Sequence, residues 1–152
     1  MKVPLSKPAI DEREIESVSK VLRSGWLAHG EMNKEFERMF SEYHNVQYPI
    51  SMNSCTSALY LALVAQGITG KVLVPSFTFV ASANAIVNAG AEPVFVDINY
   101  SDGNIDTSQL EEYFTPDLQA IMVVHFAGQA ANMDAITAFA RKYNLFIIED
   151  SA

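Results

Sequence analysis

The sequence predicts an α/β fold with a mainly parallel β-sheet and helices on both faces of that sheet. Two observations support this class. From about residue 46 onward, short β-rich runs alternate with helical patterns, which is typical of strands joined by crossover helices. Three of the runs, 72–74, 121–124 and 146–148, are continuously apolar. Strands that helices cover on both faces have this composition.

Residues 1–45 are predicted to form an extended N-terminal arm followed by two amphipathic helices. Prolines within the first ten residues disfavour regular structure there. Asp11 is a suitable N-cap for a first helix that Ser24-Gly25 ends, and a glycine-bounded loop, 25–30, precedes the second helix. The apolar positions that mark the two helices are Ile15, Val18 and Leu22 in the first, and Phe36, Met39, Phe40 and Tyr43 in the second.

Residues 46–152 are predicted to form an incomplete large domain in which strands and helices alternate. In chain order, the predicted elements are strand 46–52, helix 56–65, strand 71–74, helix 79–88, strand 93–96, helix 108–114, strand 120–124, helix 133–143 and strand 145–148. Because no helix follows the last apolar strand in this sequence, the chain is expected to be the N-terminal part of a larger protein.

The composition disfavours several classes of function. With 152 residues, 49% of them hydrophobic, the chain is long enough to bury a core. Its net charge of −8 and its scattered cations argue against nucleic acid as a partner, and no apolar run is long enough to span a membrane. The single cysteine, Cys55, and the polar start of the chain predict a reducing, cytoplasmic location.

Candidate site residues lie where the predicted strands end, because ligands in open α/β sheets bind beyond the carboxyl ends of the strands. Small hydroxyl residues at the start of the helix 56–65 leave backbone N–H groups free, which favours an anion, most often a phosphate. A helix cap without a ligand explains Ser54 and Thr56 equally well. The residues selected by this rule are 53–56, 76–79, Asp97, His125 and Asp150.

Two interpretations stay open for most of these residues. A cysteine at a helix N-terminus can be an activated nucleophile or a small packed thiol, and an aromatic residue can stack on a flat ligand or fill the core. Histidine can act as acid or base or be structural, and a carboxylate can cap a loop or meet a cation. These pairs of alternatives apply to Cys55, Phe79, His125, Asp97 and Asp150. No metal site is predicted.

A set of motifs spans nearly the whole chain in a characteristic order and spacing. The motifs are 4–8, 24–27 with Gly30, 53–59, 75–82, 90–97, 124–129 and 148–152. Together they resemble the DegT/DnrJ/EryC1/StrS family of sugar aminotransferases, which have the fold-type I architecture and use pyridoxal phosphate (PLP). The resemblance therefore implies that residues 46–152 are part of a PLP-binding large domain.

The resemblance also implies roles for individual residues. Ser54, Cys55 and Thr56 match the cradle for the PLP phosphate, and Phe79 matches the residue that stacks on the pyridine ring. Asp150 matches the carboxylate that pairs with the pyridine nitrogen and keeps it protonated, so that the ring can accept electrons. Residues expected near the sugar substrate are Trp26, Gly30 and His125.

The activity implied by the resemblance is transfer of an amino group from glutamate to a nucleotide-linked keto sugar by a homodimer. The family's catalytic lysine, which holds PLP as a Schiff base, matches no lysine of this sequence, so no catalytic residue is assigned and the chain alone is expected to be inactive. One alternative is a PLP-dependent sugar dehydratase of the same family, in which a histidine replaces that lysine. Another is a non-catalytic phospholigand-binding or regulatory module of flavodoxin-like topology.

Overall fold

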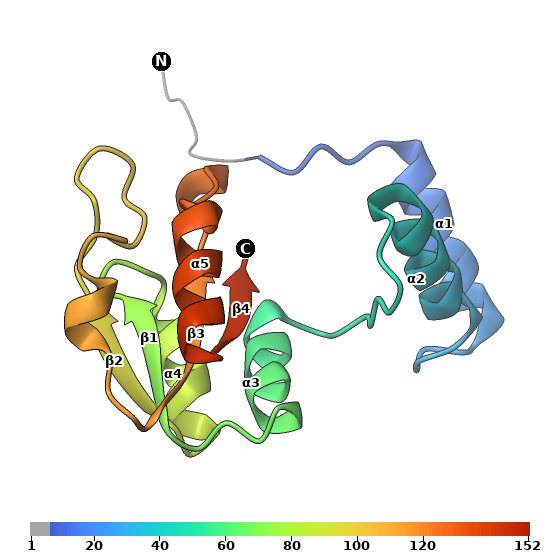
Figure 1. The fold of residues 1–152 in the computed structure, drawn as a ribbon. Helices are drawn as coiled ribbons and strands as arrows, with labels where there is room; N and C mark the ends of the chain where they lie inside the picture. The colour runs from blue at the N-terminus through green and yellow to red at the C-terminus, as the bar shows by residue number, and fades with distance from the viewer. Residues whose placement is uncertain (1–6) are drawn as a thin grey trace. The chain divides into compact units, whose positions relative to one another are not determined.

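The computed structural model describes residues 7–152, and the part of the predicted arm that covers residues 1–6 lies outside them. The chain divides into two compact units, Met1–Ser51 and Met52–Ala152 (Figure 1). None of the helices within residues 7–152 is both long and apolar enough to cross a membrane.

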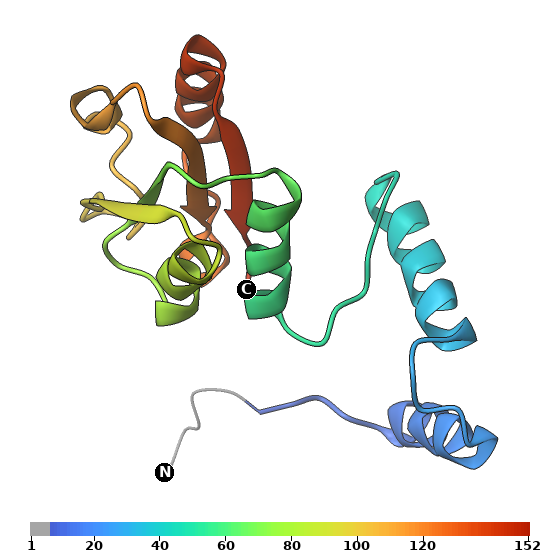
Figure 2. The same cartoon turned by 90° about the horizontal axis from the view of Figure 1, so that it is seen from below.

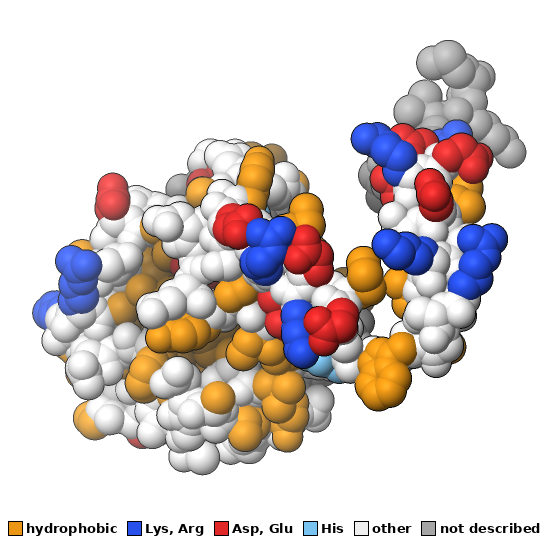
Figure 3. All heavy atoms as spheres, turned by 90° about the vertical axis from the view of Figure 1, so that its right-hand side faces the viewer, with side chains coloured by type: hydrophobic (Ala, Val, Ile, Leu, Met, Phe, Trp, Pro, Cys, Tyr) orange, Lys and Arg blue, Asp and Glu red, His pale blue; other side chains and the backbone are white. Residues whose placement is uncertain are grey.

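The first unit contains the two predicted helices, α1 (Glu12–Ser24) and α2 (Glu31–His44). Asp11 caps α1 as expected: its carboxylate accepts a hydrogen bond from the backbone N–H of Arg13, and Gly25 ends the helix at φ +72°. Neither helix has a buried residue. Charged side chains gather over this unit, with hydrophobic ones exposed between them (Figure 3).

The strand predicted over residues 46–52 is wrong, because this segment has no regular structure. No strand within residues 7–152 pairs with it, Pro49 lacks a backbone donor, and Tyr48 and Ile50 are exposed. Its end is held by a side chain of α2 instead. The backbone N–H and the hydroxyl of Ser51 both donate to Glu37 Oε1 at 2.8 Å, and these two bonds hold the pKa of the Glu37 carboxyl below its ordinary value.

The second unit is a four-stranded, wholly parallel sheet with strand order β2-β1-β3-β4. This confirms the predicted fold class. The elements are the strands β1 (Lys71–Pro75), β2 (Glu92–Val96), β3 (Leu118–Val124) and β4 (Phe146–Asp150), the helices α3 (Cys55–Ala65), α4 (Val80–Asn88) and α5 (Met133–Tyr143), and the short 3₁₀ turns η1 (Leu110–Tyr113) and η2 (Phe126–Gly128).

The helix predicted over residues 108–114 is reduced to the single turn η1. Asp106 accounts for the late start, because its carboxylate accepts hydrogen bonds from the backbone N–H and the hydroxyl of Ser108. Such a turn competes with helix formation. Pro116 follows shortly after and prevents continuation.

Each face of the sheet has its own core, because side chains of a strand alternate between the faces. On one face, Leu63 of α3 and Ile86 of α4 belong to the same buried cluster as Val72 of β1 and Met122 of β3. On the other face, α5 packs through Ile136 and Phe139, and η1 packs through Leu110. Figure 2 shows the sheet between these two layers. Helices therefore cover both faces, as predicted.

We expect Leu73→Ala to destabilise the second unit by about 2–5 kcal/mol, since Leu73 is fully buried at the centre of β1 and its loss leaves a cavity. Chemical denaturation measures the free energy of unfolding. Leu61→Ala is the matched control, because Leu61 of α3 is 43% exposed and the same substitution should cost far less there. Equal losses in the two variants would contradict this description of the core.

Candidate functional site

The carboxyl ends of the strands carry the candidate site. A parallel sheet whose connecting helices run back along it places helix N-termini at this edge. The starts of α3 and α4 lie there with the end of β4, and the described geometry brings them together at Asp150. Elements far apart in sequence therefore share one small region.

The first turn of α3 presents unpaired backbone donors. Ser54 is the N-cap, and its hydroxyl oxygen accepts a hydrogen bond from the backbone N–H of Ser57 at 3.2 Å. The backbone N–H groups of Cys55 and Thr56 have no hydrogen-bond partner among the residues that the structure describes. The first turn contains no acidic residue. This end of the helix is chemically suited to an anion.

Asp150 is the buried carboxylate of the site, with only 6% of its surface exposed. Its Oδ2 accepts a hydrogen bond from the Ser82 hydroxyl at 2.7 Å. Its Oδ1 lies 3.6 Å from Cys55 Sγ and 3.3 Å from the backbone N of Ala152, which both donate to it. The carboxylate thus joins β4 to α3 and α4.

Cys55 contacts this carboxylate as a protonated thiol. Partial burial of its sulfur raises the pKa of the thiol, and the charge of Asp150 and the hydrogen bond to it raise that pKa further. A raised thiol pKa disfavours the thiolate, which is the nucleophilic form. The alternative of an activated nucleophile is therefore disfavoured, although Cys55 itself is exposed rather than packed in the core.

Ser82 is a site residue that sequence reasoning did not select, and its partner Thr78 lies in the selected segment 76–79. Ser82 is fully buried in the first turn of α4, and its hydroxyl lies 2.8 Å from Thr78 Oγ1. The available signal was its spacing: Ser82, Ala85 and Ile86 form the buried face of the helix, so a hydroxyl there needs a partner inside the protein.

Phe79 immediately precedes α4 and its side chain is 78% exposed. The alternative that Phe79 fills the core is therefore wrong. Its exposure at the strand-end edge leaves the ring free to contact a ligand, and its predicted stacking role stays a prediction.

His125 follows β3 and is held by two partners. Its Nε2 lies 2.8 Å from Glu149 Oε2, and its Nδ1 accepts a hydrogen bond from the backbone N–H of Ala131 at 3.2 Å. Because Nδ1 accepts, the neutral ring carries its proton on Nε2 and donates to Glu149. Both ring nitrogens are thus engaged, which favours the structural alternative that the sequence left open.

Asp97 stands apart from this cluster. Its Oδ1 accepts hydrogen bonds from the backbone N–H of Ile98 at 2.8 Å and from the Ser76 hydroxyl at 3.5 Å. Asp97 therefore caps the loop after β2, which is the role that the sequence offered as the alternative to a ligand contact.

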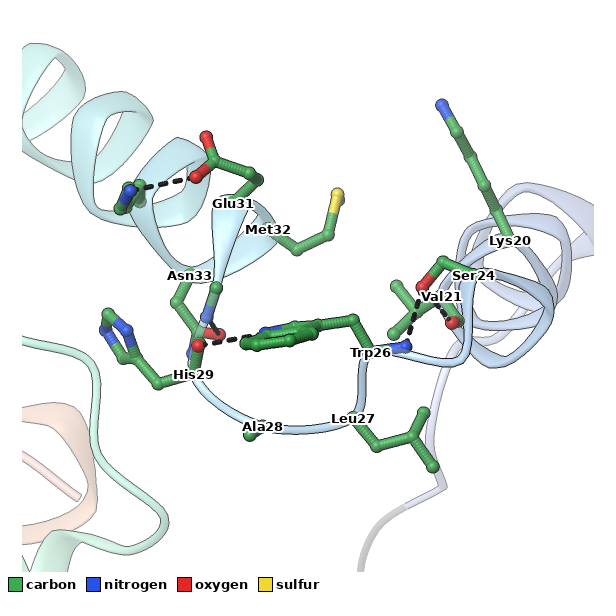
Figure 4. A pocket seen from close by; sticks show the side chains of 12 residues that line it. Lys20, Val21, Ser24, Trp26, Leu27, Ala28, His29, Glu31, Met32 and Asn33 are labelled. Atoms are coloured by element: carbon green, nitrogen blue, oxygen red, sulfur yellow. Dashed lines mark hydrogen bonds and ion pairs between the residues drawn. The ribbon is translucent and has the colours of Figure 1, made fainter.

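Trp26 and Gly30 lie in the first unit, where they line a pocket of about 570 Å³ between the end of α1 and the start of α2. Figure 4 shows the Trp26 indole across this pocket, and its Nε1 donates to the carbonyl of His29 at 3.1 Å. A Cβ at position 30 would lie 2.5 Å from Trp26 Nε1. Gly30 is therefore required for this indole position.

Comparison with known proteins supplies close relatives. The chain is 43% identical to the spore coat polysaccharide biosynthesis protein SpsC of Bacillus subtilis, over 99% of this chain and 39% of SpsC. It is 41% identical to the GDP-perosamine synthase of Caulobacter vibrioides, over 99% of this chain and 42% of that protein. The chain thus spans about two fifths of the length of these curated relatives.

The fold has a counterpart among solved structures. NtdA from Bacillus subtilis, solved with its cofactor PMP (pyridoxamine phosphate) bound, superposes with a TM-score of 0.87 at 33% identity, over 92% of this chain and 34% of NtdA. The model of the DegT/DnrJ/EryC1/StrS aminotransferase family matches residues 8–152. With a parallel sheet that has the architecture of the fold-type I large domain, the chain belongs to the DegT/DnrJ/EryC1/StrS aminotransferase family.

Proposed function

We propose that this chain forms the cofactor-binding part of a PLP-dependent sugar aminotransferase, which transfers an amino group from glutamate to the keto group of a nucleotide-linked sugar. The observation that carries the proposal is the 3.6 Å approach of Cys55 Sγ to Asp150 Oδ1. It brings the free N–H groups at the start of α3 next to a buried carboxylate. In PLP, the phosphate needs the N–H donors and the protonated ring nitrogen needs the carboxylate. Both groups belong to one small molecule, so the two features must lie close together.

The start of α3 suits the phosphate of PLP. Ser54, Cys55 and Thr56 would hold it through the unpaired N–H groups and the exposed hydroxyl of Thr56. Hydrogen bonds to a phosphate from backbone N–H groups are strengthened by the partial positive charge of a helix N-terminus. The three residues supply donors without a competing acidic side chain in the first turn of the helix.

Asp150 and Phe79 suit the ring of PLP. Asp150 would stabilise the proton on the pyridine nitrogen, and the exposed Phe79 would stack on the ring. When bound, PLP supplies an electron sink for the bond that breaks at the substrate carbon. The role of this chain in that chemistry is to hold the protonated ring in one orientation.

Within the first unit, Trp26 and Gly30 would contact the substrate, and the substrate contact expected for His125 of the second unit stays a prediction. The pocket at Trp26 offers an aromatic face suited to the base of a nucleotide. Lys20 also lines it, as does Lys34, whose amine pairs with Glu31 at 2.8 Å. We further propose that the protein works as a homodimer in the cytoplasm. The family membership supports the dimer, and a sequence of 152 residues with one cysteine, Cys55, suits a reducing compartment.

Asp150→Asn tests the proposed ring contact in the protein that carries this chain. We expect the affinity for PMP, which binds without a covalent bond, to fall about 10- to 100-fold, because a hydrogen bond to a charged group contributes about 1.5–3 kcal/mol. Absorbance titration measures the affinity. Asp97→Asn is the matched control, since Asp97 also follows a strand but caps its own loop. Unchanged affinity in Asp150→Asn would overturn the assignment of Asp150.

The pairing of Cys55 with Asp150 predicts a pH effect on alkylation. The Asp150 charge raises the pKa of the thiol, so Asp150→Asn should lower it and accelerate alkylation by iodoacetamide at mildly alkaline pH. The pKa of the Cys55 thiol in the variant should still lie above the ordinary pKa of a cysteine. Burial is the larger cause of the raised pKa, and it persists when the Asp150 charge is removed. Mass spectrometry follows the reaction on the peptide that contains Cys55. A thiol pKa equal to that of the unchanged protein would contradict the pairing.

Residues 1–152 expressed alone should not catalyse transamination. In the second unit, Lys71 begins β1 at the opposite end of the strands and pairs with Asp117, while Lys142 of α5 pairs with Glu111. With PLP, glutamate and borohydride, we expect no site-specific reduced adduct on a lysine by peptide mapping. An adduct on one lysine together with turnover of a keto sugar would refute this expectation.

A further inference from the structure

The two oxygens of Asp150 have different partners. Oδ2 accepts the Ser82 hydroxyl at 2.7 Å, which is the shortest hydrogen bond to this side chain. Oδ1 accepts two longer bonds, from Cys55 Sγ at 3.6 Å and from the backbone N of Ala152 at 3.3 Å. A short bond on one side and long ones on the other mean that Ser82 is the principal restraint on the carboxylate.

Ser82 is well placed to act as a restraint because it cannot move easily. Its side chain is fully buried, and the neighbouring buried residues of α4, Ala85 and Ile86, pack in the core beneath the sheet. Its backbone N–H donates to the carbonyl of Phe79 at 3.1 Å. Since Phe79 and Ser82 lie in the same helical turn, one rigid element positions the exposed ring and the hydroxyl that holds Asp150.

The direction of the hydrogen bonds follows from the chemistry of the groups. An ionised carboxylate can only accept, so the Ser82 hydroxyl gives its one proton to Asp150. The proton between Ser82 and Thr78, whose oxygens are 2.8 Å apart, must then come from Thr78. The result is a chain in which Thr78 donates to Ser82 and Ser82 donates to Asp150. Chains of this kind polarise their members and strengthen each bond.

We propose that Ser82 is a positioning residue for the cofactor ring: its hydroxyl, oriented by Thr78, occupies Oδ2 of Asp150 and so directs Oδ1 toward the start of α3. This proposal rests on the proposed function, because it requires Asp150 to meet the pyridine nitrogen of PLP. Ser82 does not contact the reacting atoms. It acts through Asp150 alone, by limiting the rotation of the carboxylate.

Ser82→Ala tests this role in the protein that carries the chain. We expect the affinity for PMP to fall about tenfold, as for the loss of one hydrogen bond to a charged group. We also expect the nitrogen of bound, ¹⁵N-labelled PMP to lose its proton at a lower pH, because a misoriented carboxylate stabilises the protonated ring less. Nuclear magnetic resonance of the labelled nitrogen reports this pH directly and does not depend on turnover.

Companion variants separate positioning from folding. Ser82→Thr retains the hydroxyl and should restore both the affinity and the titration of the nitrogen. Thr78→Val removes only the second hydroxyl and should shift both readouts in the same direction by less, whereas Thr78→Ser should leave them unchanged. Ser108→Ala is the matched control, since the Ser108 hydroxyl makes an equally short 2.7 Å bond to Asp106 at a distant loop. Circular dichroism establishes that each variant is folded.

The outcomes distinguish this inference from the proposed function. If Asp150→Asn weakens PMP binding while Ser82→Ala and Thr78→Val match the unchanged protein in affinity and nitrogen titration, the positioning role is wrong and the proposed function stands. If Asp150→Asn itself has no effect, the proposed ring contact fails and the role of Ser82 fails with it. Should Ser82→Ala not fold, an unchanged Thr78→Val would still overturn the chain of hydroxyls.

Discussion

The parallel direction of all four strands is the constraint on which the rest of the second unit depends. Neighbouring parallel strands can be joined only by a connection that returns to the other end of the sheet. The helices α4 and α5 make these returns, from β1 to β2 and from β3 to β4, so their N-termini lie where the strands end. The helix α3 leads into β1, and its start reaches the same edge through the contact of Cys55 with Asp150. Unpaired N–H groups at Cys55 and Thr56 and the carboxylate of Asp150 consequently meet at one edge.

Burial of Asp150 shapes the chemistry of that edge. A buried carboxylate without partners is strongly destabilising, and here each oxygen has at least one donor. Partial burial raises the pKa of the Cys55 thiol and the charge of Asp150 raises it further, so the thiol stays protonated. The cysteine therefore serves as a donor to the carboxylate, and the anion site beside it is formed by backbone groups whose charge does not depend on pH.

The segments where sequence and structure disagree lack the interactions that a regular element needs. Residues 46–52 have apolar side chains and would suit a strand, but no strand in the described part of the chain pairs with them, and Ser51 bonds to Glu37 of α2. Residues 108–114 suit a helix, yet the Asp106 side chain and Pro116 leave room only for η1. In both segments, competing partners outweigh intrinsic propensity.

The sequence by itself determined the elements that local chemistry controls: the cap at Asp11, the end of α1 at Gly25, the cap at Ser54 and the buried strands. It also selected Asp150 and the start of α3, since strand ends follow from the pattern. Only the tertiary structure decided that Ser82 donates a hydrogen bond to Asp150 and that Phe79 is exposed. It also decided that both ring nitrogens of His125 are hydrogen-bonded, to Glu149 and to Ala131. Ser82 and Asp150 lie 68 positions apart in the chain, so no local sequence pattern indicates that they are in contact. The contact forms because the fold brings the start of α4 and the end of β4 together.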